Sequence, residues 1–282
     1  MSTLKRDDNG SIGYYFRASA FALLDTVKRE SETKAREFTF TVPDSLGSFS
    51  LQVAGFTTDY YSSSAEASFT VVKPGHGEKT SLTGFDIKNS DKQFIDNRDK
   101  HSYYIMEVGK TEWMRENLAW NGAGHAFRNC DVMSPIFGRY YTWEEAQNAC
   151  PEDWRLPSEK DWQDLLSNIG IKTDEYSDAA GAAGLLMENI SFNGTAMWPF
   201  SRKIKISNSA RFSAIPSGYT LMEGSSVKFS ELYNYAVFWS SDKAEDGGYC
   251  RYIYKDEDRL YSGVRDTKSF GASVRCVRDI KN

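Results

Sequence analysis

Residues 137–162, FGRYYTWEEAQNACPEDWRLPSEKDW, decide the fold that this sequence predicts. The stretch reads as an aromatic strand, a short helix, a Pro-anchored loop and the start of a second helix. Thr142 followed by Glu145 forms a capping box, which places the start of the first helix there. Trp143 and Cys150 are seven residues apart and share one face of that helix. We therefore expect Cys150 to point into the core.

The second helix of this stretch begins after Pro157. Ser158 followed by Asp161 gives a second capping pattern, and Gly170 suits the position just past a helix C-terminus. An apolar stripe on this helix is expected to pack against the core, and it comprises Trp162, Leu165, Leu166 and Ile169. Two short helices joined by a Trp-Arg-Leu-Pro strap indicate a packing device rather than a cofactor site.

The last apolar segment of the chain is expected to be a strand. Its alternating residues share one face, and they are Phe270, Ala272, Val274 and Cys276. A core-facing Cys150 on a helix and a core-facing Cys276 on this strand are natural partners for a disulfide. Such a bond closes a long loop and stabilises by roughly 4 kcal/mol in the chain-entropy model. Cys130 and Cys250 either pair with each other or stay free.

Composition and length limit the classes of protein to consider. The chain has 282 residues, of which 40% are hydrophobic and 14% aromatic, and its net charge is −5. The length suits two globular domains, and the many Tyr and Trp suit β structure and binding surfaces. A nucleic-acid binder would show a basic face, and no long Lys/Arg run exists. No apolar run is long enough to span a membrane.

The N-terminal part predicts a small β domain over residues 1–75. Alternating segments at 36–42, 47–53 and 67–72 predict three strands, and residues 14–30 suit either a strand or a helix. We expect an all-β immunoglobulin-like sandwich, either complete or partial, followed by a linker at 76–83 and a second domain at 84–282. The Pro- and Gly-rich KPGHGEKT at 73–80 lacks the spacing of a phosphate-binding loop.

The second domain is expected to open with a hairpin. Residues 94–108 read as two strands around a polar turn, and EWMRENL at 112–118 follows. Asp96, Asp99 and Glu116 are residue types that bind cations. Turns are rich in Asp for other reasons, however, and the spacing of an EF-hand is missing. We expect no metal site here.

Motifs for catalysis are missing from the sequence. The three His are scattered, no H-E-x-x-H or C-x-x-C occurs, and no G-x-S-x-G marks a nucleophile. The pair Glu144–Glu145 belongs to a helix cap, and 256–258 (Asp-Glu-Asp) belongs to a hairpin turn. The sequence therefore predicts a non-enzymatic protein without a cofactor.

Five sequence blocks carry a family resemblance. The second domain resembles the Fibrobacter succinogenes major paralogous domain, which occurs in surface lipoproteins and secreted proteins of Fibrobacter and gut Bacteroidetes. The blocks are TEWMRENL (111–118), GRYYTWEEAQNACPEDWRLPSEKDWQDLL (138–166), FSAIPSGY (212–219), FWSS (238–241) and SVRCVRD (273–279). The N-terminal strands resemble the last strands of a bacterial immunoglobulin-like module.

The resemblance implies a fold more firmly than a function. The pattern is similar to an α+β C-type-lectin-like fold, including its formylglycine-generating-enzyme branch. In that fold a helix cysteine bonds to one on the last strand, which matches Cys150 and Cys276. The Glu-Pro-Asn, Gln-Pro-Asp and Trp-Asn-Asp motifs of calcium-dependent lectins do not occur. Nothing around Cys130 or Cys250 reproduces the reactive pair of the enzymes.

A binding surface is expected at residues 239–265. YCRYIYKDEDRLY at 249–261 combines Tyr, Arg and acidic residues around a turn, and Tyr and Arg are preferred at interfaces. The alternative is a hairpin with ordinary cross-strand pairs. The candidate ligand-binding residues are Trp239, Tyr249, Arg251, Tyr252, Tyr254, Asp256, Arg259, Tyr261 and Arg265.

The resemblance implies a cell-surface adhesion or binding protein that recognises a glycan or a protein. We expect no nucleic-acid partner, and a membrane attachment only through a lipid anchor. The first residues, MSTLKRDDNG, are polar, so either the protein is cytoplasmic or a leader precedes this chain. The disulfide favours the second interpretation: an outer-membrane lipoprotein, or a secreted or periplasmic protein. Three alternatives stay open: a structural envelope module, a retroelement-diversified receptor, and a formylglycine-generating-type enzyme.

Overall fold

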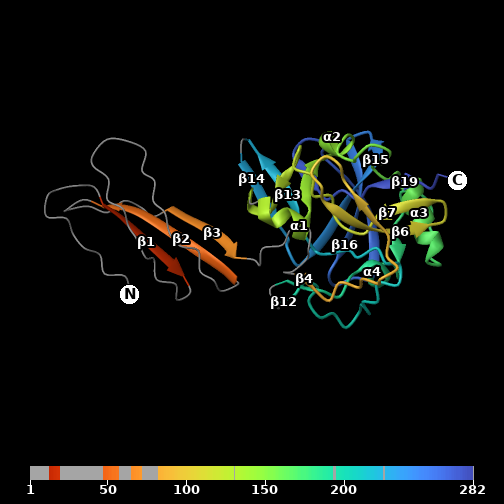
Figure 1. Ribbon diagram of the computed structural model, residues 1–282, viewed down its shortest axis with the longest axis horizontal. Coiled ribbons are helices and arrows are strands. Elements are labelled where there is room, and N and C mark those ends of the chain that lie inside the picture. The colour runs from red at the N-terminus through yellow and green to blue at the C-terminus, as the bar shows by residue number, and fades with distance from the viewer. Residues whose placement is uncertain are drawn as a thin grey trace. The chain divides into compact units, whose positions relative to one another are not determined.

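The chain divides into two units, Met1–Lys73 and Pro74–Asn282, and in both of them the described residues form more strand than helix (Figure 1). The computed structural model describes residues 13–19, 47–56, 65–71, 82–129, 131–192, 195–224 and 226–281. Most of the expected linker at 76–83 lies outside these residues. Its last two residues, Leu82–Thr83, form strand β4 of the second unit.

The described part of the first unit is one antiparallel sheet. Its strands are β1 Gly13–Ser19, β2 Gly47–Phe56 and β3 Ala65–Val71, in the order β1-β2-β3. The strands predicted at 47–53 and 67–72 match β2 and β3, and the one at 36–42 lies outside the described residues. An immunoglobulin-like sandwich needs two facing sheets. The described residues give one, so that expectation is corrected.

The described residues of the second unit form four sheets, and all of the strand pairs in them are antiparallel. Two of them form the candidate site. The first has the order β10-β17-β16-β15, with β10 Ala179–Ala180, β15 Tyr235–Ala244, β16 Gly247–Tyr254 and β17 Arg259–Arg265. The second has the order β14-β13-β18-β9-β8, with β8 His125–Ala126, β9 Arg139–Thr142, β13 Tyr219–Glu223, β14 Ser226–Ser230 and β18 Phe270–Ala272.

The other two sheets are smaller. One has the order β19-β7-β6-β5, with β5 Gln93–Ile95, β6 Ser102–Val108, β7 Thr111–Met114 and β19 Val277–Asp279. The other has the order β12-β11-β4, with β11 Ser191–Phe192 and β12 Thr195–Ala196. The predicted hairpin at 94–108 is therefore confirmed as β5 and β6.

The helices are short. They are the 3₁₀ turns η1 Phe127–Asn129 and η2 Asp131–Met133, and the α-helices α1 Ser134–Phe137, α2 Trp143–Ala146, α3 Glu159–Asn168 and α4 Ala183–Leu186. Both predicted capping boxes are present at the starts of α2 and α3. Beyond Ala146 the chain continues in i→i+3 hydrogen bonds as far as Ala149, and Pro151 ends the run.

These element lengths correct the expected fold class. The sequence predicted an α+β C-type-lectin-like domain, and the described residues are mainly β. Among the described helices only α3 exceeds four residues. The capping patterns located the helix starts correctly, but a cap sets a start and not a length. The regular structure of this unit therefore consists largely of antiparallel sheets.

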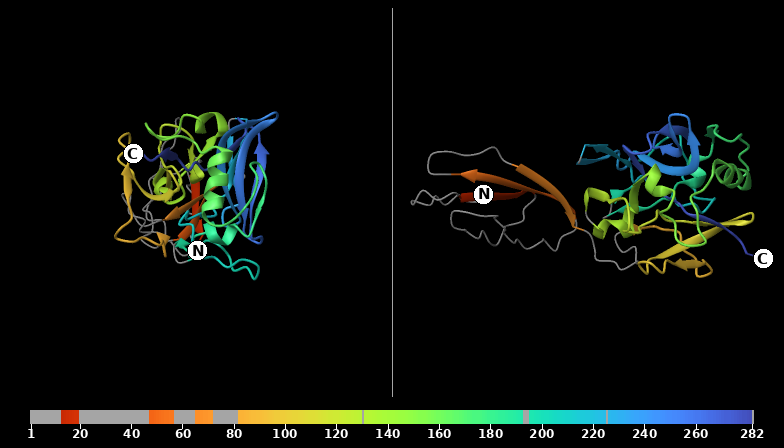
Figure 2. Two further views of the ribbon diagram at one scale, coloured as in Figure 1. Left: turned by 90° about the vertical axis from the view of Figure 1, so that its right-hand side faces the viewer. Right: turned by 90° about the horizontal axis from the view of Figure 1, so that it is seen from above.

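Two buried clusters lie on the opposite faces of the β15–β17 sheet. On one face, Phe238, Ile253 and Leu260 pack with Trp162 of α3, and α3 lies beside β15 (Figure 2). On the other face, Val237, Trp239 and Cys250 pack with residues of β9 and β18. The sheet thus forms the middle layer of the unit, because apolar side chains cover both of its faces.

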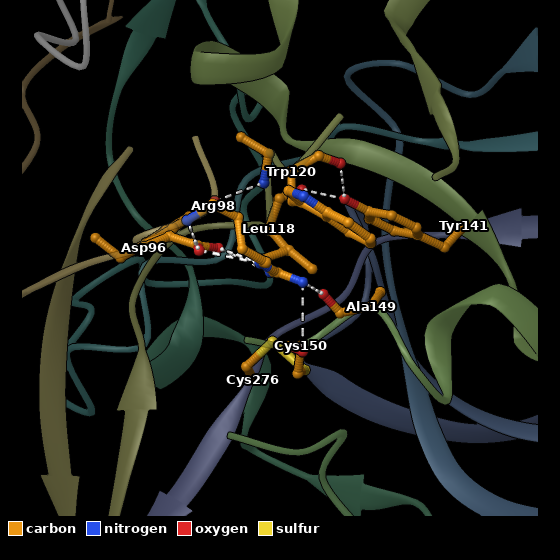
Figure 3. Close-up of a disulfide and its surroundings, with 10 residues drawn as sticks. Asp96, Arg98, Leu118, Trp120, Tyr141, Ala149, Cys150 and Cys276 are labelled. Carbon is orange, nitrogen blue, oxygen red and sulfur yellow. Dashed lines mark hydrogen bonds and ion pairs between the residues drawn. A yellow bond between two sulfur atoms is a disulfide. The ribbon is translucent and has the colours of Figure 1, made fainter. Parts of the chain in front are cut away.

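The predicted disulfide joins Cys150 and Cys276 across 126 residues of sequence. Arg98, in the turn between β5 and β6, holds the chain beside it (Figure 3). Its guanidinium pairs with the buried Asp96 at 2.7 Å and donates to the carbonyl of Ala149 at 2.9 Å. It also lies 4.0 Å from the ring centroid of Trp120. The hairpin, the end of the α2 segment and the last strand are tied together at this point.

Candidate functional site

The alternation of side chains along three neighbouring strands builds the candidate site. Tyr235 of β15 pairs with Tyr254 of β16, and Tyr252 of β16 pairs with Tyr261 of β17. Paired residues of antiparallel strands project to the same face of a sheet. The β15–β17 sheet therefore gathers tyrosines on one face, next to the buried Trp239 and Cys250.

A hollow of about 340 Å³ opens between this face and the neighbouring sheet. Its volume is in the range of small-molecule sites in proteins. Strands β15, β16 and β17 supply one side, and β13 with β18 supply the other. The lining residues are Tyr219, Leu221, Tyr235, Val237, Tyr252, Arg265 and Phe270. We call this set the tyrosine hollow.

The rings of the tyrosine hollow contact one another in sequence around its wall. Tyr219 stacks on Phe270 with centroids 4.9 Å apart, and Tyr219 and Tyr235 are 6.3 Å apart. Tyr235 lies 6.2 Å from Tyr252. Tyr252 in turn stacks on Tyr261 at 4.9 Å with an interplanar angle of 10°. Such contacts limit the freedom of each ring, so the wall is ordered before any ligand arrives.

The charge of the hollow comes from Arg265. Its guanidinium carbon lies 5.7 Å from the ring centroids of both Tyr252 and Phe270. Burial raises the pKa values of Tyr219 and Tyr252, and the positive charge of Arg265 lowers them in part. Both phenols therefore stay protonated at neutral pH and remain able to donate hydrogen bonds.

Two of the residues expected at the binding surface are buried. Trp239 is fully buried, and its indole nitrogen donates to the carbonyl of Tyr141 at 2.7 Å. Arg251 is also fully buried, pairs with the buried Glu159 and donates to the carbonyl of Ser177 at 2.6 Å. Neither side chain presents surface to a ligand, and both hold neighbouring elements in place.

Four other expected residues lie around or behind the hollow. Tyr249 projects to the opposite face of the sheet, where its ring lies 4.6 Å from Tyr176. Tyr254 contacts Tyr235 at 4.9 Å beside the hollow. Asp256 belongs to the turn between β16 and β17, and Arg259 pairs with Asp178 at 3.5 Å.

Tyr261 supports the stacked wall from outside the hollow. Its hydroxyl donates to Glu257, and this hydrogen bond raises the pKa of Tyr261 to about 12. Of the nine expected residues, Tyr252 and Arg265 are the two that line the hollow. The structure brings them together with five residues that the sequence did not single out as binding residues.

These missed residues are Tyr219, Leu221, Tyr235, Val237 and Phe270. Tyr235 is the first residue of β15, and Val237 lies within its buried segment on the same face, so the period-2 pattern of this strand was their only signal. Tyr219, Leu221 and Phe270 come from β13 and β18, which pair with each other across about 50 residues. Nothing local in the sequence predicts that pairing.

A larger hollow of about 700 Å³ lies elsewhere on the second unit. Its charged residues already pair with one another, for example Arg211 with Asp91 at 2.5 Å and Lys92 with Glu107. We therefore favour the smaller tyrosine hollow, whose one charged lining residue, Arg265, has no ion-pair partner among the described residues. Among the described residues, no group of three or more His, Cys, Asp or Glu is placed to hold a metal ion.

The four cysteines differ in environment. Cys150 and Cys276 are bonded to each other, and Cys250 is a free thiol in the core. Burial raises the pKa of the Cys250 thiol to about 12, so it stays protonated and inert at neutral pH. Cys130 lies outside the described residues.

A family profile described as the Fibrobacter succinogenes major domain matches residues 106–278, more than half of the chain. The chain belongs to this family. The match confirms the family resemblance, and it spans every residue of the tyrosine hollow and both half-cystines. Membership of the major-domain family indicates a surface-associated protein.

Other comparisons add no relative. No curated protein and no solved structure matches the chain. In the described part of the chain, no helix has both the length and the apolar character needed to cross a membrane.

Proposed function

We propose that this chain is a non-enzymatic binding protein of the cell surface that takes a glycan in the tyrosine hollow. The observation that carries the proposal is the continuous aromatic wall from Phe270 through Tyr219 and Tyr235 to Tyr252. The partly exposed rings of Tyr219, Tyr235 and Tyr252 offer apolar faces to the C–H face of a sugar ring, and their hydroxyls offer hydrogen bonds at the edge.

The shape of this surface favours a binding protein over a structural module that only spaces other domains. A structural envelope module is expected to present a flat or convex surface over residues 239–265, and here a concave surface is lined by four aromatic rings. The wall is also fixed in place, because each ring contacts the next. Preorganised rings reduce the entropy that is lost when a ligand binds.

A glycan array probed with the full-length protein tests the proposal. We expect binding to a limited set of oligosaccharides, and Tyr252→Ala and Tyr235→Ala should each weaken it at least tenfold, since each removes one ring of the wall. Tyr249→Ala is the matched control, because Tyr249 lies in the same strand as Tyr252 and projects to the other face.

Two outcomes would contradict the proposal. Either no glycan binds, or glycans bind and the Tyr249 variant loses affinity while the Tyr252 variant keeps it. A pull-down that captures a protein through the same hollow would replace the glycan with a protein ligand.

A further inference from the structure

Arg265 differs from several other arginines of the second unit in having no carboxylate partner among the described residues. Arg259 on the same strand pairs with Asp178 at 3.5 Å, and Arg278 pairs with Glu112 at 2.6 Å. Arg265 is exposed, and its side chain donates to the carbonyl of the adjacent Val264 at 2.9 Å. Most of its five N–H donors are therefore free for a ligand.

Neighbouring residues hold this guanidinium at the edge of the tyrosine hollow. Gly263 lies one side-chain position before Arg265 on the same face of β17. A methyl group on Gly263 would lie 3.1 Å from Cε1 of Tyr252 and 3.5 Å from Nη1 of Arg265. The missing side chain at Gly263 therefore lets the phenol ring and the guanidinium approach each other over the strand.

The acids of this face are already engaged. Asp178 pairs with Arg259, and Glu231 accepts a hydrogen bond from the side chain of Asn234 at 2.9 Å. Neither lines the hollow. The hollow thus combines an aromatic wall with one unpaired positive charge.

We infer that the ligand of the tyrosine hollow is an acidic glycan, with a hexuronate ring stacked on Tyr252 and its carboxylate paired with Arg265. The inference rests on the proposed function and narrows its ligand class. A guanidinium matches a carboxylate with two parallel N–H···O bonds. A hexuronate carries its carboxylate at the edge of the sugar ring. When the sugar stacks on Tyr252, this carboxylate can therefore reach Arg265, which lies beside the Tyr252 ring.

The recognition is local rather than long-range. The whole chain has a net charge of −5, which does not attract an anion from solution. An acidic ligand therefore gains its affinity at the contact itself. Its binding should weaken with salt less steeply than that of a ligand held by a basic surface.

The test uses an array of hexuronate-containing oligosaccharides, each printed beside its carboxyl-reduced neutral counterpart, with the full-length protein. We expect the acidic member of a bound pair to bind at least about tenfold tighter, as measured by calorimetry. Arg265→Gln should remove this difference by weakening the binding of the acidic member, because the charge that pairs with the carboxylate is gone. Arg265→Lys should restore part of it, because Lys keeps the charge without the planar fork.

Arg259→Gln is the matched control, since Arg259 lies on the same strand and already has an acidic partner. Equal affinity for acidic and neutral members, or an unchanged preference in Arg265→Gln, would overturn the inference and leave the glycan proposal intact. Binding to neutral glycans alone would also overturn the inference and leave the glycan proposal intact. If no glycan of either kind binds, the proposed function fails together with the inference. Thermal unfolding of each variant shows that it is folded.

Discussion

Gly248 and Trp143 determine how closely helix α2 approaches the β15–β17 sheet. A methyl group on Gly248 would lie 2.1 Å from Cδ1 of Trp143, and the indole nitrogen of Trp143 donates to the carbonyl of Ser240 at 2.9 Å. The indole thus lies flat against a strand that has no side chain at that point. A bulkier residue would separate the helix from the sheet.

The change Gly248→Ala is expected to lower the free energy of unfolding by about 1–3 kcal/mol, because the added methyl overpacks a fixed indole. Urea unfolding followed by Trp fluorescence measures this change. Gly263→Ala on the next strand is the comparator. Its methyl would lie 3.1 Å from the edge of Tyr252, 1 Å farther than the Gly248 methyl from Trp143, and it should cost less than about 1 kcal/mol. Equal losses in the two variants would show that the Trp143 contact is not special.

The lowered pKa of the Asp161 carboxyl makes the free energy of unfolding depend on pH. Burial raises the pKa of this carboxyl, but the Arg155 guanidinium and the amide and hydroxyl of Ser158 outweigh burial, so the pKa lies below the ordinary 3.8. A depressed carboxyl pKa means that the unfolded chain binds more protons than the folded chain in acid. The stability due to Asp161 is therefore complete above pH 3.8 and is lost as the pH falls through the depressed value.

We expect Asp161→Asn to destabilise the protein by about 1–2 kcal/mol at pH 7, through loss of the capping contacts and of a partly exposed ion pair. This difference from the wild type should shrink at pH values below 3.8. Denaturant unfolding between about pH 7 and pH 2 provides the measurement. Asp164→Asn is the control, since Asp164 lies exposed on the same helix. A difference that stays constant over the whole acid range would contradict the assignment.

At the scale of elements, the disulfide links the end of the α2 segment to the residue directly before the last strand, β19. Replacing both Cys150 and Cys276 with Ala should lower the free energy of unfolding by about 4–5 kcal/mol, because the bond closes a loop of more than 100 residues. Reduction of the wild type in denaturant should give the same midpoint as the double variant. Cys250→Ala, which removes the free buried thiol, shows what the loss of sulfur volume alone costs. A double variant as stable as the wild type would rule out a structural role for the bond.

Arg98 connects the β5–β6 turn to the end of the α2 segment through non-covalent contacts. The change Arg98→Ala removes an ion pair with a buried carboxylate and a hydrogen bond to the α2 segment. Because Asp96 is then left buried without its cation, we expect a loss of about 2–4 kcal/mol and faster reduction of the disulfide by a thiol. Asn97→Ala, in the same turn, should change stability by less than about 0.5 kcal/mol. Similar effects of the two changes would mean that the turn as a whole, and not the guanidinium, holds the segment.

Local signals in the sequence predicted where helices and strands begin, but they did not predict how these elements pack against one another. Thr142, Glu145, Ser158 and Asp161 located two helix starts, because capping depends on residues three apart. The alternation of Phe270, Ala272, Val274 and Cys276 placed all four in one buried cluster, although the structure breaks the strand after Ala272. The α+β expectation was wrong because the length of a helix depends on its packing partners and not on its cap.

The candidate site shows the same limit at the scale of the whole molecule. Tyr252 and Arg265 lie within one hairpin, and the Tyr- and Arg-rich sequence of that hairpin was enough to single them out. Tyr219 and Phe270 reach the hollow only because β13 pairs with β18. Trp239 and Arg251 were included among the expected binding residues because they are close in sequence to the others, although both are buried. Which side of a strand faces the core is decided by packing partners that the local sequence does not contain.

The division of the chain into Met1–Lys73 and Pro74–Asn282 gives a prediction about the whole molecule. The disulfide, both buried clusters and the tyrosine hollow all lie within the second unit. A chain of residues 74–282 should therefore fold by itself, with a cooperative thermal transition that a reductant shifts downward. Calorimetry of this fragment and of the full chain should give the same transition temperature within about 2 °C, since a unit with its own core unfolds independently. If the fragment shows no cooperative transition, the second unit depends on the first for its stability, and the hollow must then be studied only in the full chain.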